Sequence, residues 1–284
     1  MLKVGASLWI GNLRELSSYI SRVKSSDFDY VEISFDYPLG IEDKDTVNKI
    51  INELSTMNLL HAVHAPWADI ALASPIDSVR KASLECIRNA IDFASKLNSE
   101  YVVVHISSSQ KVCLDYSNEN PCLKAAILSI RELETLANEY GIPVVIENVP
   151  DKCCGTLYQM GKILDNVSQI DICLDLGHAA YVKLKEGDSF NDLADIAKEW
   201  FPVVNHKVLV LHIHGVVKRG SHIEDHVELS EVKVNFKEIL KTYKSSLRYV
   251  TLEVFKSCKS KSLDILNLSN YVKKIKSWAL ALMV

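Results

Sequence analysis

The apolar segments of this sequence that are expected to form β-strands end on residue types that bind metal ions. Each run has the composition of a strand covered on both faces, so a carboxylate or imidazole at its C-terminal end is an exception. Six strand ends carry such groups, which together indicate one site with many potential ligands. The residues are His64, His105, Glu147, Asp175, His178, His212, His214 and Glu253.

These side chains favour a transition-metal site. Imidazole and carboxylate ligands without thiolate fit zinc, manganese, iron or cobalt better than a cysteine-rich structural zinc site or an all-oxygen calcium site. Four residues on four expected strands would suffice for one divalent ion. They are Glu147, Asp175, His212 and Glu253.

The remaining candidates exceed the needs of one ion. His64 and His105 precede Glu147 along the chain, and Glu147 could bridge them to a second ion. Closely spaced metals suit phosphodiester chemistry, because they activate water and neutralise charge on the attacking and leaving oxygens. A third ion could be held by His178, Glu224 and His226.

Several polar or aromatic residues near these segments have two interpretations. We expect His214 on the opposite side of its strand from His212, so that only one of them points into the site. Glu32 is either a substrate contact or a charge inside the fold. Trp67, three residues after His64, either forms the wall of a sugar or base pocket or packs under a loop.

The elements that must position these groups alternate between strand-like and helix-like segments. Eight βα units in succession predict an α/β fold, a (β/α)8 TIM barrel formed as a single domain by residues 1–284. In that fold the functional groups lie at the C-terminal ends of the strands. The expected strands are residues 3–9, 29–35, 59–64, 101–106, 143–148, 171–176, 208–214 and 248–255.

The main rival architecture is an open doubly wound sheet. Such a sheet usually has a glycine-rich phosphate-binding turn after its first strand, and GASLWIGN matches that turn poorly. Residues 215–234 form the longest polar connection, so we expect them to be a lid or a loop that lines the site.

Composition narrows the class of protein. The net charge of −4 gives no overall electrostatic signature of nucleic-acid binding. No run approaches the ~20 apolar residues of a membrane span, and no signal peptide is visible, so we expect a cytoplasmic protein without a membrane partner. The seven scattered cysteines suggest reduced thiols, with a Cys113–Cys122 disulfide as the alternative.

Strand by strand, the chain resembles the xylose isomerase-like TIM-barrel superfamily. The matching motifs are VEIS, HAPWADIALAS, VVVHIS, VVIENVP, CLDLGHA, VLHIHG and VTLEVF. Its sugar isomerase and epimerase branch implies one divalent ion on the four ligands named above. That branch also implies that Glu147 and Glu253 act as acid and base, and that His178 contacts the substrate.

The endonuclease IV branch of the same superfamily implies three zinc ions. Glu224 stands where that branch has an aspartate, and the adjacent Asp225 leaves open which of them is the loop ligand. The motifs ENVPDKCC, DLGH and HIHG depart from the ENTAG, DTCH and HLND of the endonucleases. The nine implied ligands are His64, His105, Glu147, Asp175, His178, His212, Glu224, His226 and Glu253.

Two functions follow as expectations. The first is a divalent-metal-dependent (zinc, manganese, cobalt or magnesium) isomerase or epimerase of a small sugar, sugar phosphate or polyol, working by proton transfer through an enediolate. The alternative is a zinc-dependent AP endonuclease that hydrolyses DNA at abasic sites, with up to three zinc ions. DNA is a partner only in the alternative, and a homo-oligomer is compatible with both.

Overall fold

The computed structural model describes residues 1–9, 16–36, 43–110, 112, 120–150, 153–256 and 264–282. Its centre is a closed barrel of parallel strands in the order β1-β10-β7-β6-β5-β4-β3-β2. This confirms the predicted (β/α)8 barrel, and each expected strand segment contains one of these strands. They are β1 (Lys3–Leu8), β2 (Tyr30–Ser34), β3 (Leu60–His64), β4 (Val102–His105), β5 (Val144–Glu147), β6 (Asp171–Asp175), β7 (Val208–Ile213) and β10 (Tyr249–Leu252).

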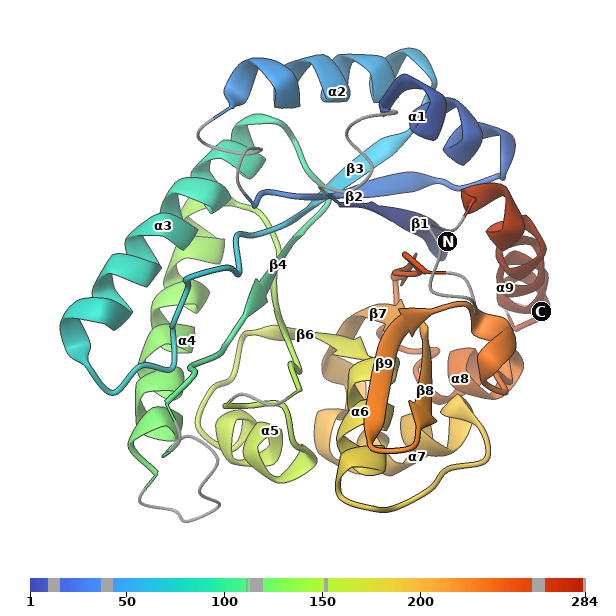
Figure 1. The fold of residues 1–284 in the computed structure, drawn as a ribbon. Helices are drawn as coiled ribbons and strands as arrows, with labels where there is room; N and C mark the ends of the chain where they lie inside the picture. Colours follow the sequence, from blue (N-terminus) through green and yellow to red (C-terminus); the bar gives the residue numbers. More distant parts are fainter. Residues whose placement is uncertain are drawn as a thin grey trace.

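Helices surround the barrel and cover the outer face of its strands (Figure 1). The long helices α3 and α4 lie side by side on one flank, and α9 lies on the flank that carries both ends of the described chain (Figure 1). The helices are α1 (Leu16–Ser25), α2 (Lys44–Thr56), α3 (Asp77–Lys96), α4 (Pro121–Tyr140), α5 (Leu157–Leu164), α6 (Leu176–Lys185), α7 (Leu193–Val204), α8 (Phe236–Thr242) and α9 (Ser269–Ala281). None of the helices described is long and apolar enough to cross a membrane.

Local sequence signals set the helix boundaries, as α4 illustrates. The Asn120 side chain accepts hydrogen bonds from the backbone N–H groups of Cys122 and Leu123, and Pro121 occupies the first turn. At the other end Gly141 adopts a left-handed conformation with φ of 65°, which a residue without a side chain adopts at little cost.

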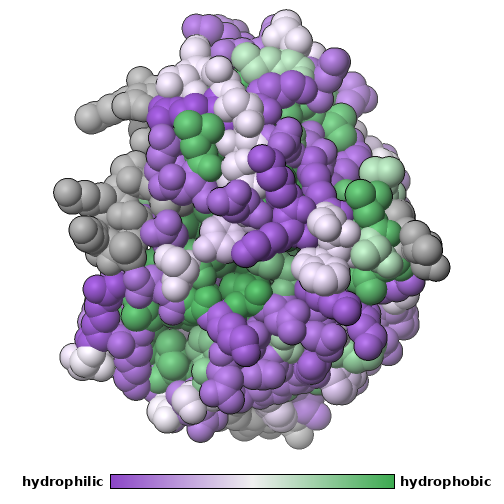
Figure 2. All heavy atoms as spheres, turned by 90° about the vertical axis from the view of Figure 1, so that its right-hand side faces the viewer, coloured by the Kyte–Doolittle hydropathy of each residue, from purple (hydrophilic) through white to green (hydrophobic). Residues whose placement is uncertain are grey.

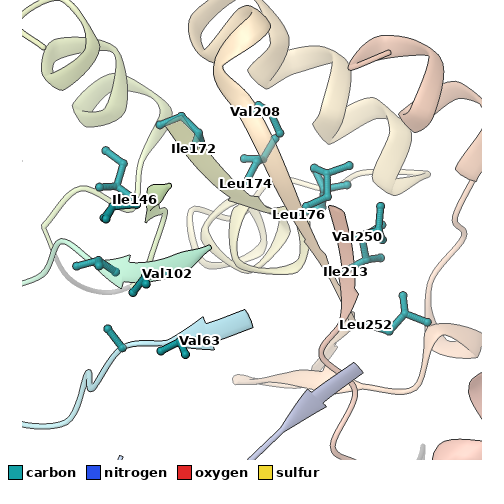
Figure 3. Packing of buried hydrophobic residues seen from close by; sticks show 14 of the residues in the cluster. Val63, Val102, Ile146, Ile172, Leu174, Leu176, Val208, Ile213, Val250 and Leu252 are labelled. Carbon is teal, nitrogen blue, oxygen red and sulfur yellow. The ribbon is translucent and has the colours of Figure 1, made fainter. Parts of the chain in front are cut away.

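Side chains alternate along each strand between two hydrophobic layers. On β5, Val144 and Ile146 belong to the large layer between strands and helices, whereas Val145 belongs to a small cluster inside the barrel. Figure 3 shows the outer layer, to which several strands contribute valine, leucine and isoleucine. Because the strand period is two, Glu147 shares the inner face with Val145.

Tyrosines fill part of the barrel interior. The Tyr30 hydroxyl is hydrogen-bonded to Thr251 Oγ1 at 2.8 Å, and the Tyr101 hydroxyl contacts Tyr30 at 3.1 Å. A β-carbon at Gly5 would lie 2.3 Å from the Tyr30 ring, so a glycine on β1 is what leaves room for that ring. The interior is therefore packed below the strand ends, and the polar groups lie above this packing.

Residues 215–234 were expected to form a lid or site-lining loop, and most of them form a β-hairpin. Strands β8 (Gly215–Arg219) and β9 (His222–Val227) pair antiparallel, and the hairpin lies beside α6 (Figure 1). Asp225 and His226, near its end, line a pocket together with residues from the C-terminal ends of the barrel strands. The connection therefore lines the site, as expected, but as regular structure.

The surface on the α9 side is largely hydrophilic, with separate hydrophobic patches (Figure 2). Within α9 itself, Val272 and Ile275 are buried, whereas Trp278 and Leu280 are exposed.

Cys122 is disulfide-bonded, but Cys113 lies outside the described residues, so the proposed Cys113–Cys122 pair stays a prediction.

Candidate metal centre

The predicted ligands on the strands face the barrel axis at the C-terminal end of the barrel. Each lies an even number of positions from a residue of the barrel interior, such as Val145, and therefore on the same inner face of its strand. Several neighbouring strands thus carry a carboxylate or imidazole above the interior packing. One atom from each of four residues lies within 4.8 Å of the corresponding atom of the other three, and all four residues are buried. This central group consists of Glu147, Asp175, His212 and Glu253.

The central group has the properties of a cation site. Glu147 Oε1, Asp175 Oδ2 and His212 Nδ1 are buried and make no hydrogen bond with any residue that the structure describes. Nδ1 of His212 lies 3.5 Å from Glu147 Oε1 and 3.4 Å from Glu253 Oε2. Buried polar atoms normally form hydrogen bonds, so oxygen and nitrogen atoms that converge here without them fit the binding of a divalent cation.

Glu32 orients the imidazole of the central group. His212 Nε2 donates a hydrogen bond to Glu32 Oε2 at 3.1 Å, which leaves Nδ1 directed at the other ligands. The same oxygen accepts hydrogen bonds from the Tyr101 hydroxyl at 2.6 Å and from Thr251 Oγ1 at 3.2 Å. Glu32 is fully buried, so it is a charge inside the barrel, and it holds the candidate ligand His212 in the way that carboxylates commonly hold metal-binding histidines.

Asp175 is held in place from two sides. Its Oδ1 accepts a hydrogen bond from the His178 backbone N–H at 2.6 Å and so caps the start of α6, which leaves Oδ2 for the cation site. Asn148, directly after β5, donates to the Asp175 carbonyl at 2.9 Å and accepts from the Asp175 backbone N–H at 2.8 Å. These two hydrogen bonds join the ends of β5 and β6, which carry Glu147 and Asp175.

A second group of potential ligands shares Glu147 with the first. It consists of His64, His105 and Glu147. Nε2 of His64 lies 3.3 Å and Nε2 of His105 lies 2.9 Å from Glu147 Oε2. His64 Nδ1 donates to the carbonyl of Ala65 at 3.0 Å, which fixes the orientation of its ring.

A third group shares Asp175 and has a composition that the sequence did not predict. It consists of Asp175, His178, His214 and His226. His214 Nε2 lies 3.1 Å from Asp175 Oδ1, and the His214 ring stacks on that of His226 at 4.1 Å. The expectation that only one of His212 and His214 points into the site was wrong, because residues two apart in a strand lie on the same face.

The two acidic residues of the hairpin occupy different places. Glu224 lies near Lys256, with 3.8 Å between Oε1 and Nζ, and it is in none of the ligand groups found among the described residues. Asp225 lines the pocket, and its Oδ1 lies 3.2 Å from His226 Nδ1. The geometry therefore places Asp225 nearer to the site than Glu224.

A cavity of about 590 Å³ opens above these groups at the mouth of the barrel. Glu147, His178 and Glu253 reach it, together with His64, His105 and His226. Aromatic and apolar side chains form much of its wall, and Trp67 is among them, so this residue lines a pocket and does not merely pack under a loop. The wall residues are Trp9, Trp67, Val149, Pro150 and Phe255.

Carboxylates and imidazoles shift one another's pKa values in this centre. Burial raises the pKa of Glu147 and Glu253, but the neighbouring histidines outweigh burial and hold both pKa values well below the usual range. Burial lowers the pKa of His212, yet Cys173 and the surrounding carboxylates raise it well above its usual value. A proton on His212 thus supplies positive charge at a place where a metal ion would supply it.

Sequence reasoning missed two residues of this environment, Asn148 and Cys173, and expected a third, His214, on the wrong side of its strand. Asn148 and His214 contact Asp175 as described, and Cys173 lies close to both Glu147 and His212. Strand parity could have indicated Cys173 and His214, because each is two residues from a ligand on the same strand segment. For Asn148 the only signal was its position next to Glu147.

Comparison with known proteins identifies the family. Residues 20–275 match the family model described as xylose isomerase-like TIM barrel, and the chain belongs to this family. An uncharacterized protein of Methanocaldococcus jannaschii is 28% identical over 249 residues, which cover 86% of this chain and 80% of that protein. A probable endonuclease 4 of Natronomonas pharaonis is 26% identical over 120 residues, which cover 41% of this chain and 40% of that protein.

A solved structure with the same fold is that of a D-tagatose 3-epimerase-like protein. Its TM-score is 0.73 at 22% identity, and the similarity covers 100% of both chains. At this level of identity the similarity establishes the shared barrel.

Proposed function

We propose that this protein is a divalent-metal-dependent isomerase or epimerase of a small sugar, sugar phosphate or polyol. The observation that carries the proposal is the pair of carboxylates Glu147 and Glu253. They stand on β5 and just after β10, both reach the cavity, and both belong to the central ligand group. Two carboxylates that face one cavity from different strands suit removal of a proton on one side of a carbon and its return on the other.

The residues of the central group would hold the metal ion. When bound, a divalent ion there would polarise the carbonyl and hydroxyl oxygens of a substrate and so acidify the C–H bond next to them. One of Glu147 and Glu253 removes that proton, and the other returns a proton, to the opposite face of the same carbon in an epimerase or to the adjacent carbon in an isomerase. His178 reaches the cavity, and its Nδ1 donates to the Asn148 carbonyl at 3.1 Å, so Nε2 would be the atom that contacts a substrate hydroxyl.

The walls of the cavity are compatible with a carbohydrate. Trp9 and Phe255 stack at 5.4 Å, and Trp67 faces His105 at 6.0 Å between ring centroids. Aromatic rings offer apolar faces to the C–H groups of a sugar while polar side chains bind its hydroxyls. The D-tagatose 3-epimerase-like structure of the same fold supports this substrate class.

Solvent-exchange assays test the proposal. The metal-loaded protein is incubated in deuterated water with ketoses, aldoses and their phosphates, and deuterium at the carbon next to the carbonyl is measured by NMR. The expected result is that deuterium enters one pair of epimers and that chelation of the metal abolishes this incorporation. No incorporation in any member of the panel by a fully loaded protein would contradict the proposal.

A zinc-dependent AP endonuclease is the second candidate. The overlap of several ligand groups through Glu147 and Asp175 favours it, because adjacent metal ions suit phosphodiester hydrolysis. Cleavage of a duplex with one abasic site, compared with an intact duplex, tests this candidate directly. Cleavage at the abasic site by the zinc-loaded protein would favour it over the epimerase.

A further inference from the structure

Two cysteines that no step of the proposed chemistry uses lie side by side behind one wall of the cavity. Cys153 and Cys154 are adjacent in sequence, both side chains are fully buried, and their sulfur atoms are 2.8 Å apart. A disulfide has an S–S bond of roughly 2 Å, so less than about 1 Å of further approach would bring the two atoms to bonding distance.

The backbone brings the two sulfur atoms together. Neighbouring residues in an extended chain direct their side chains to opposite sides. Cys154 instead has φ of 74°, in the left-handed region that residues with a side chain rarely adopt. The strained conformation places both thiols on one side of the chain, and the fold maintains it.

Contacts on both sides hold this conformation in place. The Cys154 backbone N–H donates to Gln159 Oε1 at 2.9 Å, which ties the pair to α5. A β-carbon at Gly155 would lie 1.9 Å from the Val149 carbonyl oxygen, so the chain after the pair packs directly on Val149. Val149 and Pro150 line the cavity, and the pair therefore lies immediately behind a wall of the candidate site.

From this geometry we propose that Cys153 and Cys154 are a reversible two-electron redox site that closes to a disulfide between adjacent residues. With hydrogen peroxide as oxidant, two S–H bonds and one O–O bond break, one S–S bond forms, and the two thiols and the peroxide give the disulfide and two water molecules. A thiol reductant reverses the reaction by exchange. The fold holds the sulfur atoms close to bonding distance, so the disulfide forms faster than either cysteine is oxidised further to sulfinic or sulfonic acid.

Peptide mapping of the folded, metal-free wild-type protein tests the proposal. The protein is reduced, freed of reductant, treated with increasing hydrogen peroxide, alkylated after denaturation and cut with trypsin. Cleavage after Lys152 and Lys162 places both cysteines in one peptide. The expected product is that peptide with no alkyl group and a mass two hydrogens below the dithiol, and reduction before alkylation restores both alkylation sites.

Two controls make the result specific. The exposed Cys86 reports how much oxidant reached the protein, because the structure gives it no cysteine partner among the described residues. In Cys154→Ser, Cys153 should stay open to alkylation at low peroxide. The proposal is overturned if the wild-type peptide stays doubly alkylated, or carries sulfinic or sulfonic acids, at peroxide doses that fully oxidise Cys86.

Discussion

Gly177 and His214 fit against each other at the start of α6. A β-carbon at position 177 would lie 2.2 Å from Cε1 of the His214 ring, so only glycine accommodates the imidazole in this position. His214 accepts a hydrogen bond from the His226 backbone N–H at 3.0 Å and approaches Asp175. The glycine of DLGH and the second histidine of HIHG are therefore one structural feature, contributed by the segments that directly follow the neighbouring strands β6 and β7.

Gly177→Ala should displace the His214 ring and destabilise the protein by about 1–3 kcal/mol, the usual cost of overpacking a buried site. Urea unfolding measures the change. Gly161→Ala is the matched control, because its new methyl group meets Val203 at 3.4 Å and the residue lies inside α5, where alanine is favoured. The explanation fails if adding His214→Ala to Gly177→Ala recovers none of the lost stability.

Glu32→Gln should weaken metal binding by roughly 10–100-fold without removing a ligand, because the His212 ring loses its charged acceptor. Isothermal titration with zinc and manganese measures the affinity. Tyr101→Phe removes a different hydrogen bond to the same carboxylate oxygen and should have a smaller effect. Equal affinity in Glu32→Gln and wild type would show that His212 does not bind the metal through Nδ1.

The sequence predicted the barrel and the central ligand group because both depend on short-range patterns. Apolar runs specify the strands. Because side chains alternate between the two faces of a strand, the same runs also specify which side chains, such as Val145 and Glu147, share the inner face and meet toward the barrel mouth. The hairpin and the places of Glu224 and Asp225 depend on contacts between distant segments, such as that of Glu224 with Lys256. No local pattern encodes those contacts.

Glu253→Gln should lower epimerase turnover by roughly 100-fold or more, because the amide can neither accept the proton nor bind the metal as well. Activity and metal content are measured on the same sample, so that loss of the ion is distinguished from loss of the base. Glu199→Gln, at an exposed ion pair with Lys183, should leave both unchanged. Full activity in Glu253→Gln would remove this residue from the mechanism.

Metal binding should weaken as pH falls. Burial lowers the pKa of His64, but its hydrogen bond to Glu147 and the nearby carboxylates raise it to about 9 in the metal-free protein. A divalent ion on Glu147 would repel the positive charge of the neighbouring His64 and lower its pKa, so titration at pH 7 in buffers of different ionisation enthalpy should show proton release. A metal affinity that is constant from pH 6 to pH 9 would contradict this assignment.

The same shift predicts how the metal-free protein responds to pH. A pKa of about 9 in the folded protein, against an ordinary value of 6.5, makes His64 stabilising when it is protonated. Its contribution is fully present below about pH 6.5 and is lost as pH rises through about 9. Urea unfolding of metal-free wild type and His64→Gln should therefore differ less at pH 9.5 than at pH 6, and an increasing difference would reverse the predicted sign.

Elemental analysis of the purified, catalytically active protein tests the central claim most directly. The proposed epimerase predicts about one divalent ion per chain, held by Glu147, Asp175, His212 and Glu253 and lost in step with activity during chelation. About three zinc ions per chain would contradict the mononuclear proton-transfer site and support phosphodiester hydrolysis instead.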